Sequence, residues 1–185
     1  MISQSAKDAF YTLFTQATEE TLNREGKTHK WNIKPIARID HIRAKEFIVL
    51  TLCSYEFRIF MTIHFTCNRR TIQYIAESLH MPSQQVTRNK FYDYLGEYGN
   101  NYCGTIKREL QVVFSHLGMS TPDLLEERSF KHFEHLKYEY SLYAEATSEN
   151  NVTLTFGLYV CPYGDLNFVL PEKVAQTVTG ELELF

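Results

Sequence analysis

The chain has 185 residues, of which 19 are Lys or Arg and 22 are Asp or Glu, giving a formal net charge of −3. This length suits one domain with a sizeable core, and the weakly acidic balance argues against a protein that binds nucleic acid through its phosphates. No apolar run approaches the roughly 20 residues that cross a bilayer, and residues 1–8 lack the pattern of a signal peptide. The 4 cysteines form no Cys-x-x-Cys pair and are typical of free thiols in a reducing compartment. We therefore expect a cytoplasmic protein without nucleic-acid or membrane partners.

The amino-terminal part of the chain predicts a helix, an edge strand, a hairpin and a short helix. Apolar residues recur at helical spacing over residues 5–22. Residues 33–39 alternate around a proline, which favours an edge strand. Residues 47–53 and 57–65 predict the two strands of a hairpin. Asn68 is a candidate N-cap for the short helix that follows.

The rest of the chain predicts one long helix followed by strands. The long helix is expected over residues 83–117, capped by Ser83 and ended by Gly118. Residues 121–133 are polar and predict no particular element, and Pro171 suits the first turn of a terminal helix. Strands are expected over 137–146, 152–160 and 166–170. This order favours an α+β fold, with a largely antiparallel sheet covered by helices and residues 1–185 forming one domain.

The predicted long helix has two different faces. At about 100° per residue, a set of apolar side chains falls within roughly 60° of the side opposite Glu97, which predicts the core face. This set is Phe91, Leu95, Tyr102, Ile106, Leu110, Val113 and Leu117. A polar set lies around Glu97 itself: Asp93, Asn100, Asn101, Gly104 and Arg108. Lys90 projects to the same side.

Gly104 is unusual on the polar face, because glycine inside a helix costs about 1 kcal/mol relative to alanine. It removes bulk next to a carboxylate and an amide, so another molecule can approach closely. Glu97 and Asn100 lie one turn apart, roughly 4.5 Å along the axis. They can present an anionic acceptor and a two-way hydrogen-bonding amide to one partner surface.

The run Glu97-x-x-Asn100-x-x-x-Gly104, with Asp93 one turn before it, resembles the signature of the CheC/CheX chemotaxis phosphatases. The order of predicted elements also resembles theirs over most of the chain. The resemblance implies a CheX-like domain that accelerates hydrolysis of the aspartyl phosphate on a CheY-like response regulator. It also implies that the regulator carries the Mg²⁺ and a lysine, so that this protein needs no cofactor of its own.

The resemblance also assigns roles to residues of the long helix. Glu97 would pair with the lysine of the regulator and fix the docking register, and Asn100 would orient water in line with the phosphorus. Gly104 would let the regulator come close. Candidates for the rest of the partner surface are Asp93, Asn101, Arg108 and Lys90.

Two residues in or directly after the run differ from the family signature, and a second run elsewhere in the chain has the same Glu-x-x-Asn spacing. Thr105 follows the glycine where the family often has Asn, and Cys103 replaces a usual Ala. A second Glu-x-x-Asn run, Glu20 to Asn23, falls at a helix end and has Lys27 in the glycine position, so we interpret it as a chance match.

Other interpretations stay open. Without the resemblance, Glu97 and Asn100 would be ordinary members of a solvated helix face. The two differences from the family signature favour an alternative function, in which the chain is a catalytically silent adaptor of the same fold that binds a signalling partner or itself. The unprotected edge strands also leave a homodimer open. His132 and His135 have the spacing of a metal pair, but no third ligand is placed by the sequence, so we expect surface histidines and no metal site.

Overall fold

The computed structural model describes residues 1–23, 30–39 and 44–171. Its centre is a seven-stranded sheet with the strand order β1-β6-β7-β3-β2-β4, and β5 also pairs with β2. All the ladders between these strands are antiparallel. The strands are β1 (Trp31–Pro35), β2 (Glu46–Cys53), β3 (Phe57–Phe65), β4 (Gly118–Met119), β5 (Asp123–Glu126), β6 (Tyr140–Ser148) and β7 (Thr153–Pro162).

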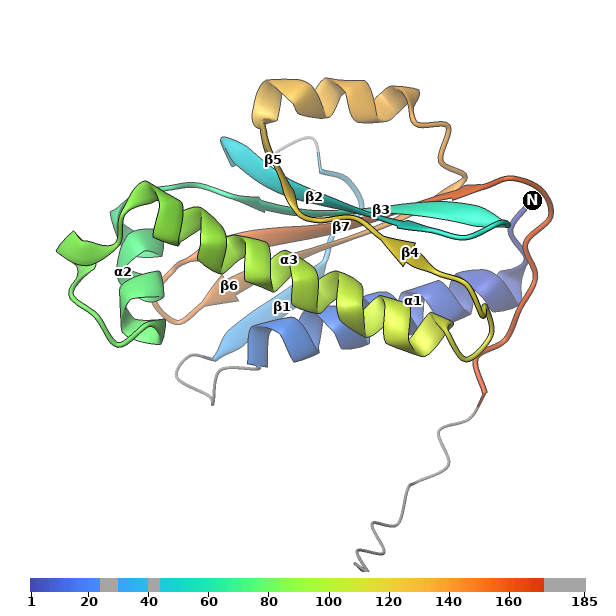
Figure 1. Cartoon of the computed structure of the whole chain (residues 1–185), viewed down its shortest axis with the longest axis horizontal. Coiled ribbons are helices and arrows are strands. Elements are labelled where there is room, and N and C mark those ends of the chain that lie inside the picture. Colours follow the sequence, from blue (N-terminus) through green and yellow to red (C-terminus); the bar gives the residue numbers. More distant parts are fainter. Residues whose placement is uncertain (24–29, 40–43, 172–185) are drawn as a thin grey trace, which may run out of the picture.

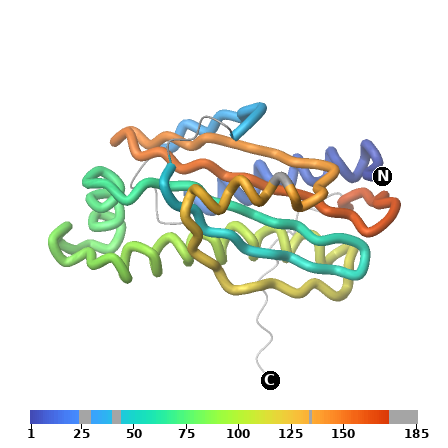
Figure 2. Tube along the Cα trace, turned by 90° about the horizontal axis from the view of Figure 1, so that it is seen from above, coloured from blue at the N-terminus to red at the C-terminus, as the bar shows by residue number. Residues whose placement is uncertain are grey.

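Helices cover both faces of the sheet unequally. The long helices α1 (Gln4–Asn23) and α3 (Arg88–Leu110) lie side by side on one face, as Figure 1 shows. The short helix α2 (Arg69–Ser78) lies beside the amino-terminal end of α3. The 3₁₀ helix η2 (Glu127–His135) lies on the opposite face of the sheet, and Figure 2 shows it crossing above the strands. The predicted α+β fold is therefore confirmed.

Several local predictions agree with the structure. The first helix and the β2–β3 hairpin form where the hydrophobic periodicity placed them. Asn68 caps α2, since its side-chain oxygen accepts hydrogen bonds from the backbone N–H groups of Arg70 and Thr71. The edge strand predicted over residues 33–39 corresponds to β1 (Trp31–Pro35), which pairs with β6 alone among the described strands and ends at Pro35. The prediction is wrong for residues 36–39, which form no strand.

The predicted long helix is shorter than expected at both ends. It begins at Arg88 because Val86 is extended and the Thr87 hydroxyl caps the first turn by accepting from the Lys90 backbone N–H. Residues 83–85 form a separate 3₁₀ turn, so Ser83 is not the cap. Leu110 is the last helical residue, and Val113 beyond it is 38% exposed, which corrects its assignment to the core. Leu117 is buried, but from the loop after the helix.

The strand predicted over residues 166–170 is wrong. Leu166 makes only an isolated bridge to Ile2, and no ladder continues from it. Leu166 and Phe168 are buried, and the Phe168 ring packs against Phe10 and Phe114. The alternating apolar pattern therefore reflects packing of an irregular segment. The terminal helix predicted after Pro171 lies outside the described residues.

Two hydrophobic layers result from this arrangement. The larger one fills the space between the sheet and the helices α1 and α3. The smaller one lies on the other face beneath η2, around Phe47, Phe133 and Tyr159. The segment of residues 121–133, for which the sequence predicted no element, supplies β5 and part of η2.

Candidate functional site

The outer face of α3 carries every residue that the sequence analysis placed in the site. Lys90, Asp93, Glu97 and Arg108 are exposed. Asn100, Asn101 and Gly104 are partly exposed on the same side. Because α3 is unbroken from Arg88 to Leu110, these residues form one accessible row. Their roles toward a partner stay predictions.

The inner face of α3 anchors the helix, and with it this row, to the core. The side chains of Phe91, Leu95, Tyr102, Ile106 and Leu110 are at most 1% exposed and pack on the sheet and α1. Cys103 is also fully buried, and burial raises the pKa of its thiol to about 12. A thiol with that pKa is protonated near neutral pH, so Cys103 is a small core residue rather than a nucleophile.

Glu97 and Asn100 contact each other directly. The Asn100 Nδ2 donates a hydrogen bond to Glu97 Oε2 at 3.1 Å. Neither side chain makes another hydrogen bond to the part of the chain that the structure describes. The contact aligns an amide and a carboxylate on neighbouring turns and leaves their other hydrogen-bonding positions open to solvent or to a partner.

Two glycines of α3 have opposite surroundings. A Cβ at Gly99 would lie 2.6 Å from Leu50 Cδ1 and 3.2 Å from Ile48 Cγ2, so Gly99 allows α3 to pack closely on β2. A Cβ at Gly104 would have no atom within 4 Å. Internal packing therefore explains Gly99 and does not explain Gly104. The open space above Gly104 is next to Asn100 and Asn101 on the helix surface.

The end of α1 completes a hollow beside this surface. The hollow has a volume of about 690 Å³. It is lined by Glu20, Thr21, Asn23, Asn100, Asn101, Gly104, Thr105 and Arg108, and we call it the α1–α3 hollow. The second Glu-x-x-Asn run, interpreted as a chance match, thus lies beside the first one. Lys27, which stands in its glycine position, is outside the described residues.

Glu20 and Thr105 are residues of this surface that the sequence analysis did not assign to it. Glu20 Oε2 accepts a hydrogen bond from Thr105 Oγ1 at 2.9 Å and from Arg108 Nη2 at 3.0 Å. Gln16 Nε2 donates to its other oxygen at 2.6 Å. Burial alone would raise the pKa of the Glu20 carboxyl, but these hydrogen bonds and the Arg108 charge outweigh it and lower the pKa. Arg108 is therefore held toward α1.

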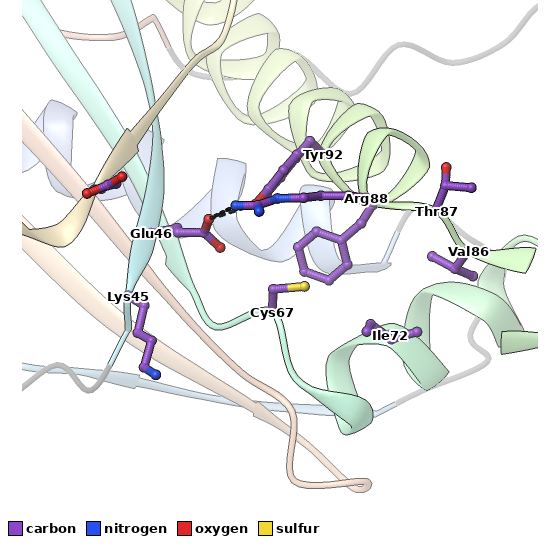
Figure 3. Close-up of a pocket in the computed structure, with 10 residues that line it drawn as sticks. Lys45, Glu46, Cys67, Ile72, Val86, Thr87, Arg88 and Tyr92 are labelled. Atoms are coloured by element: carbon purple, nitrogen blue, oxygen red, sulfur yellow. Dashed lines mark hydrogen bonds and ion pairs between the residues drawn. The ribbon is translucent and has the colours of Figure 1, made fainter. Parts of the chain in front are cut away.

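The amino-terminal end of α3 borders a second hollow, shown in Figure 3. Glu46 lies at its centre, paired with Arg88 at 3.1 Å, and it accepts a hydrogen bond from the Tyr92 hydroxyl at 2.6 Å. The thiol of Cys67 lies nearby, and burial together with the charge of Glu46 raises its pKa. The polar groups at the centre of this hollow thus have partners within the protein.

Metal-ligating side chains do not gather in the described residues. No group of three or more His, Cys, Asp and Glu side chains there could hold a metal ion. His132 and His135 lie on η2 with their ring centroids 6.3 Å apart, and both are exposed. The same part of the chain contains no helix with the length and hydropathy needed to cross a membrane.

Comparisons with known proteins identify the fold. No protein-family model matches the sequence, and no curated protein is similar to it in sequence. Solved structures do match. The CheX–CheY–BeF₃–Mg²⁺ complex from Borrelia burgdorferi superposes with a TM-score of 0.65 at 12% identity, over 82% of this chain and 97% of that one.

Two further structures agree with this match. The chemotaxis protein CheX from Vibrio vulnificus has a TM-score of 0.63 at 16% identity, over 82% of this chain and 99% of that one. A CheC-like chemotactic protein from Shewanella oneidensis MR-1 has a TM-score of 0.58 at 17% identity, over 82% and 98% of the two chains. These structures show that the chain shares its fold with CheX and CheC-like proteins.

Proposed function

From a fold shared with CheX and CheC-like proteins, we propose that the chain is a phosphatase for the aspartyl phosphate of a CheY-like response regulator. The observation that carries this proposal is the outer face of α3, where Glu97 and Asn100 contact each other beside the open space above Gly104. The match to a CheX–CheY complex supports a CheY-like partner.

The proposed reaction needs only positioning by this chain. The Glu97 carboxylate binds a lysine of the regulator through a charge-assisted hydrogen bond, which sets the register of the two proteins. The Asn100 amide enters the regulator site, accepts a hydrogen bond from water and donates one to a phosphoryl oxygen. A neutral amide suits this task because a carboxylate would repel the phosphoryl group. Water then attacks the phosphorus, and the regulator aspartate leaves.

The surrounding residues serve the docking surface in this proposal. Gly104 leaves room for the regulator, while Asp93, Asn101 and Lys90 extend the contact along α3. Arg108 lies at the end of the row and is a candidate for contact with acidic groups of the regulator, in competition with Glu20 and Glu109, which bind it within the protein. The Mg²⁺ belongs to the regulator, as part of the substrate.

The decisive experiment measures decay of a phosphorylated response regulator with and without this protein. Faster decay with the native chain is expected. The folded double variant Asn100→Ala, Asn101→Ala should leave decay at the intrinsic rate of the regulator. Normal dephosphorylation by that variant would contradict the proposal.

A second function is a silent adaptor that binds a signalling partner or a second copy. The departure at Thr105 favours it, because the family often has Asn at this position, whereas the Thr105 hydroxyl donates a hydrogen bond to Glu20 of the same chain. In that case the regulator would bind and its phosphate would still decay at the intrinsic rate. Light scattering of the free protein tests for a homodimer. A monomeric mass at all micromolar concentrations would rule the homodimer out.

A further inference from the structure

One end of the molecule exposes several large apolar side chains. The turn between β2 and β3, the turn after α3 and the segment after β7 come together at this end, as Figure 1 shows. The exposed apolar side chains that these segments and β4 contribute are those of Tyr55, Val112, Val113, Met119, Tyr163 and Val169. We call these six residues the apolar end surface.

Aromatic rings of the core hold the segments of this end together. The centroid of the Phe114 ring lies 4.9 Å from that of Phe57 and 5.1 Å from that of Phe168. Tyr55 and Val112 each precede one of these buried rings by two positions. The buried rings and the exposed side chains therefore belong to the same short segments, which meet at one end of the core.

Backbone contacts connect the remaining members to the same place. The Tyr163 N–H donates a hydrogen bond to the carbonyl of Glu56, in the turn between β2 and β3, at 2.8 Å. Met119 of β4 pairs with Leu52, near the end of β2. The apolar end surface is thus assembled from four segments that are distant in the sequence.

The side chains of this surface protrude from the core. Tyr55 is 87% exposed, Val169 is 70% exposed and Val112 is 67% exposed. A single exposed apolar side chain is ordinary, whereas a cluster of them marks a surface that binds another apolar segment. The question is which segment binds here.

The described part of the chain ends at this surface. Val169 belongs to it, Leu170 is partly buried against the core, and Pro171 is the last described residue. Residues 172–185 follow in the sequence. Fourteen residues can span roughly 46–50 Å when extended, and their attachment gives them an effective concentration in roughly the millimolar range. The following segment can therefore reach every part of the apolar end surface.

The sequence of residues 172–185 has the pattern of a segment that needs such a surface. At about 100° per residue, its apolar side chains gather within an arc of roughly 100°. These are Val174, Ala175, Val178, Leu182 and Phe185. A helix of this length is only marginally stable alone and is stabilised by burying its apolar face.

We propose that residues 174–185 pack the apolar face of a helix on the apolar end surface of the same chain. The polar face of that helix, with Gln176 and Glu183, then remains in solvent. This inference is independent of the proposed phosphatase function, because the apolar end surface contains no residue of the outer face of α3 from Lys90 to Arg108.

Melting temperatures of full-length variants test the proposal. The double variant Val178→Asp, Leu182→Asp places two charges on the apolar face and should lower the melting temperature by about 4 °C or more, since 1 kcal/mol shifts it by about 2–4 °C in a chain of this size. The double variant Gln176→Asp, Thr177→Asp adds the same charge outside that face and is the matched control. It should stay within about 1 °C of the native chain. A native melting temperature in the first variant, or an equal loss in both, overturns the proposal.

A double-mutant cycle locates the contact. Val112→Asp should also lower the melting temperature, although a substitution at so exposed a position changes little where nothing covers it. Combined with Val178→Asp, Leu182→Asp, it should lower the melting temperature no further than the more damaging of the two changes alone. Leu79→Asp, at the exposed carboxyl-terminal end of α2, is the control whose effect should add to that of the tail variant. Additive effects at Val112 overturn the proposed location.

Dependence on protein concentration tests whether the contact forms within one chain. The native melting temperature should be the same from micromolar to submillimolar concentration, because an intramolecular contact does not follow mass action. A melting temperature that rises with concentration, together with a dimer in sedimentation that Val178→Asp, Leu182→Asp abolishes, would assign the surface to a second copy and overturn the proposal.

Discussion

Two Glu-x-x-Asn runs lie side by side in this fold, one at the end of α1 and one in the middle of α3. Glu20 of the first run is held by Gln16, Thr105 and Arg108. Glu97 of the second makes its one side-chain hydrogen bond among the described residues to Asn100. The same spacing thus gives a glutamate that ties two helices together in one place and a glutamate open to a partner in the other.

The surroundings of the two runs differ in the same way. Glu20 Oε2 already accepts hydrogen bonds from Thr105 and Arg108, so this carboxylate is engaged within the protein. Glu97 forms no ion pair with the described residues, and Gly104, seven residues further along α3, leaves space above the helix. A Glu-x-x-Asn run therefore indicates a site only when its carboxylate is not already bound within the protein.

The largest expected difference between the two runs is in turnover. Asn100→Ala should reduce phosphatase activity by a factor of about 100 or more, because the attacking water loses its orientation. Asn23→Ala is the matched control and should keep activity within about twofold, since Asn23 does not position the attacking water. Loss of a radiolabelled phosphoryl group from the regulator measures both rates.

An equal effect of the two alanine substitutions would contradict this assignment. It would show that both runs take part in the reaction. Circular dichroism of both variants is the folding control, since neither asparagine is buried in the core.

The next largest difference concerns binding. Glu97→Lys should weaken the complex with the regulator by a factor of about 10–100, because a charge-assisted hydrogen bond contributes about 1.5–3 kcal/mol and is replaced by repulsion. Glu20→Gln removes the other carboxylate and should change the affinity by less than threefold. Surface plasmon resonance with immobilised regulator checks both, and a Glu97→Lys variant with native affinity would refute the docking role.

The two glycines of α3 test whether the open space belongs to a partner. Gly99→Ala should destabilise the protein by about 1–2 kcal/mol, because the new methyl group overlaps Leu50 and Ile48 in a packed core. Gly104→Ala should instead stabilise it by about 1 kcal/mol through helix propensity, while slowing dephosphorylation. Urea unfolding gives the stabilities, and a Gly104→Ala variant with full activity would show that the space is not needed for docking.

The features predicted from the sequence are those that local periodicity controls. The inner face of α3, the β2–β3 hairpin and the Asn68 cap depend on spacings within one element, which a single sequence contains. The apposition of Glu20 with Thr105 and Arg108 joins residues 85 and 88 positions apart, so no local pattern indicates it. The alternation of Leu166 and Phe168 with polar residues predicted a strand. Such alternation indicates which side chains are buried, but it does not show whether the segment pairs with a neighbouring strand.

The burial of Thr62 and His64 on β3 was missed for a related reason. Both residues stand between core residues of the strand, so their positions look like the exposed side of an ordinary strand. Their burial depends on η2, whose Phe130 and Phe133 lie in a segment with no recognisable period. A polar residue on a strand becomes informative only when the covering element is known.

The smallest expected effect concerns the run from Glu20 to Asn23, whose carboxylate is already bound within the protein. Because the folded-state pKa of Glu20 is lowered, its contribution to stability is present above the unfolded pKa of about 4.5 and is lost as the pH falls through the folded value. Glu20→Gln should therefore be slightly less stable than the native chain at pH 7, by an amount typical of partly exposed ion pairs, about 0.2–1 kcal/mol. The two melting temperatures should draw together as the pH falls below about 4.5. A difference that stays constant down to pH 3 would mean that the carboxylate charge does not hold Arg108 against α1.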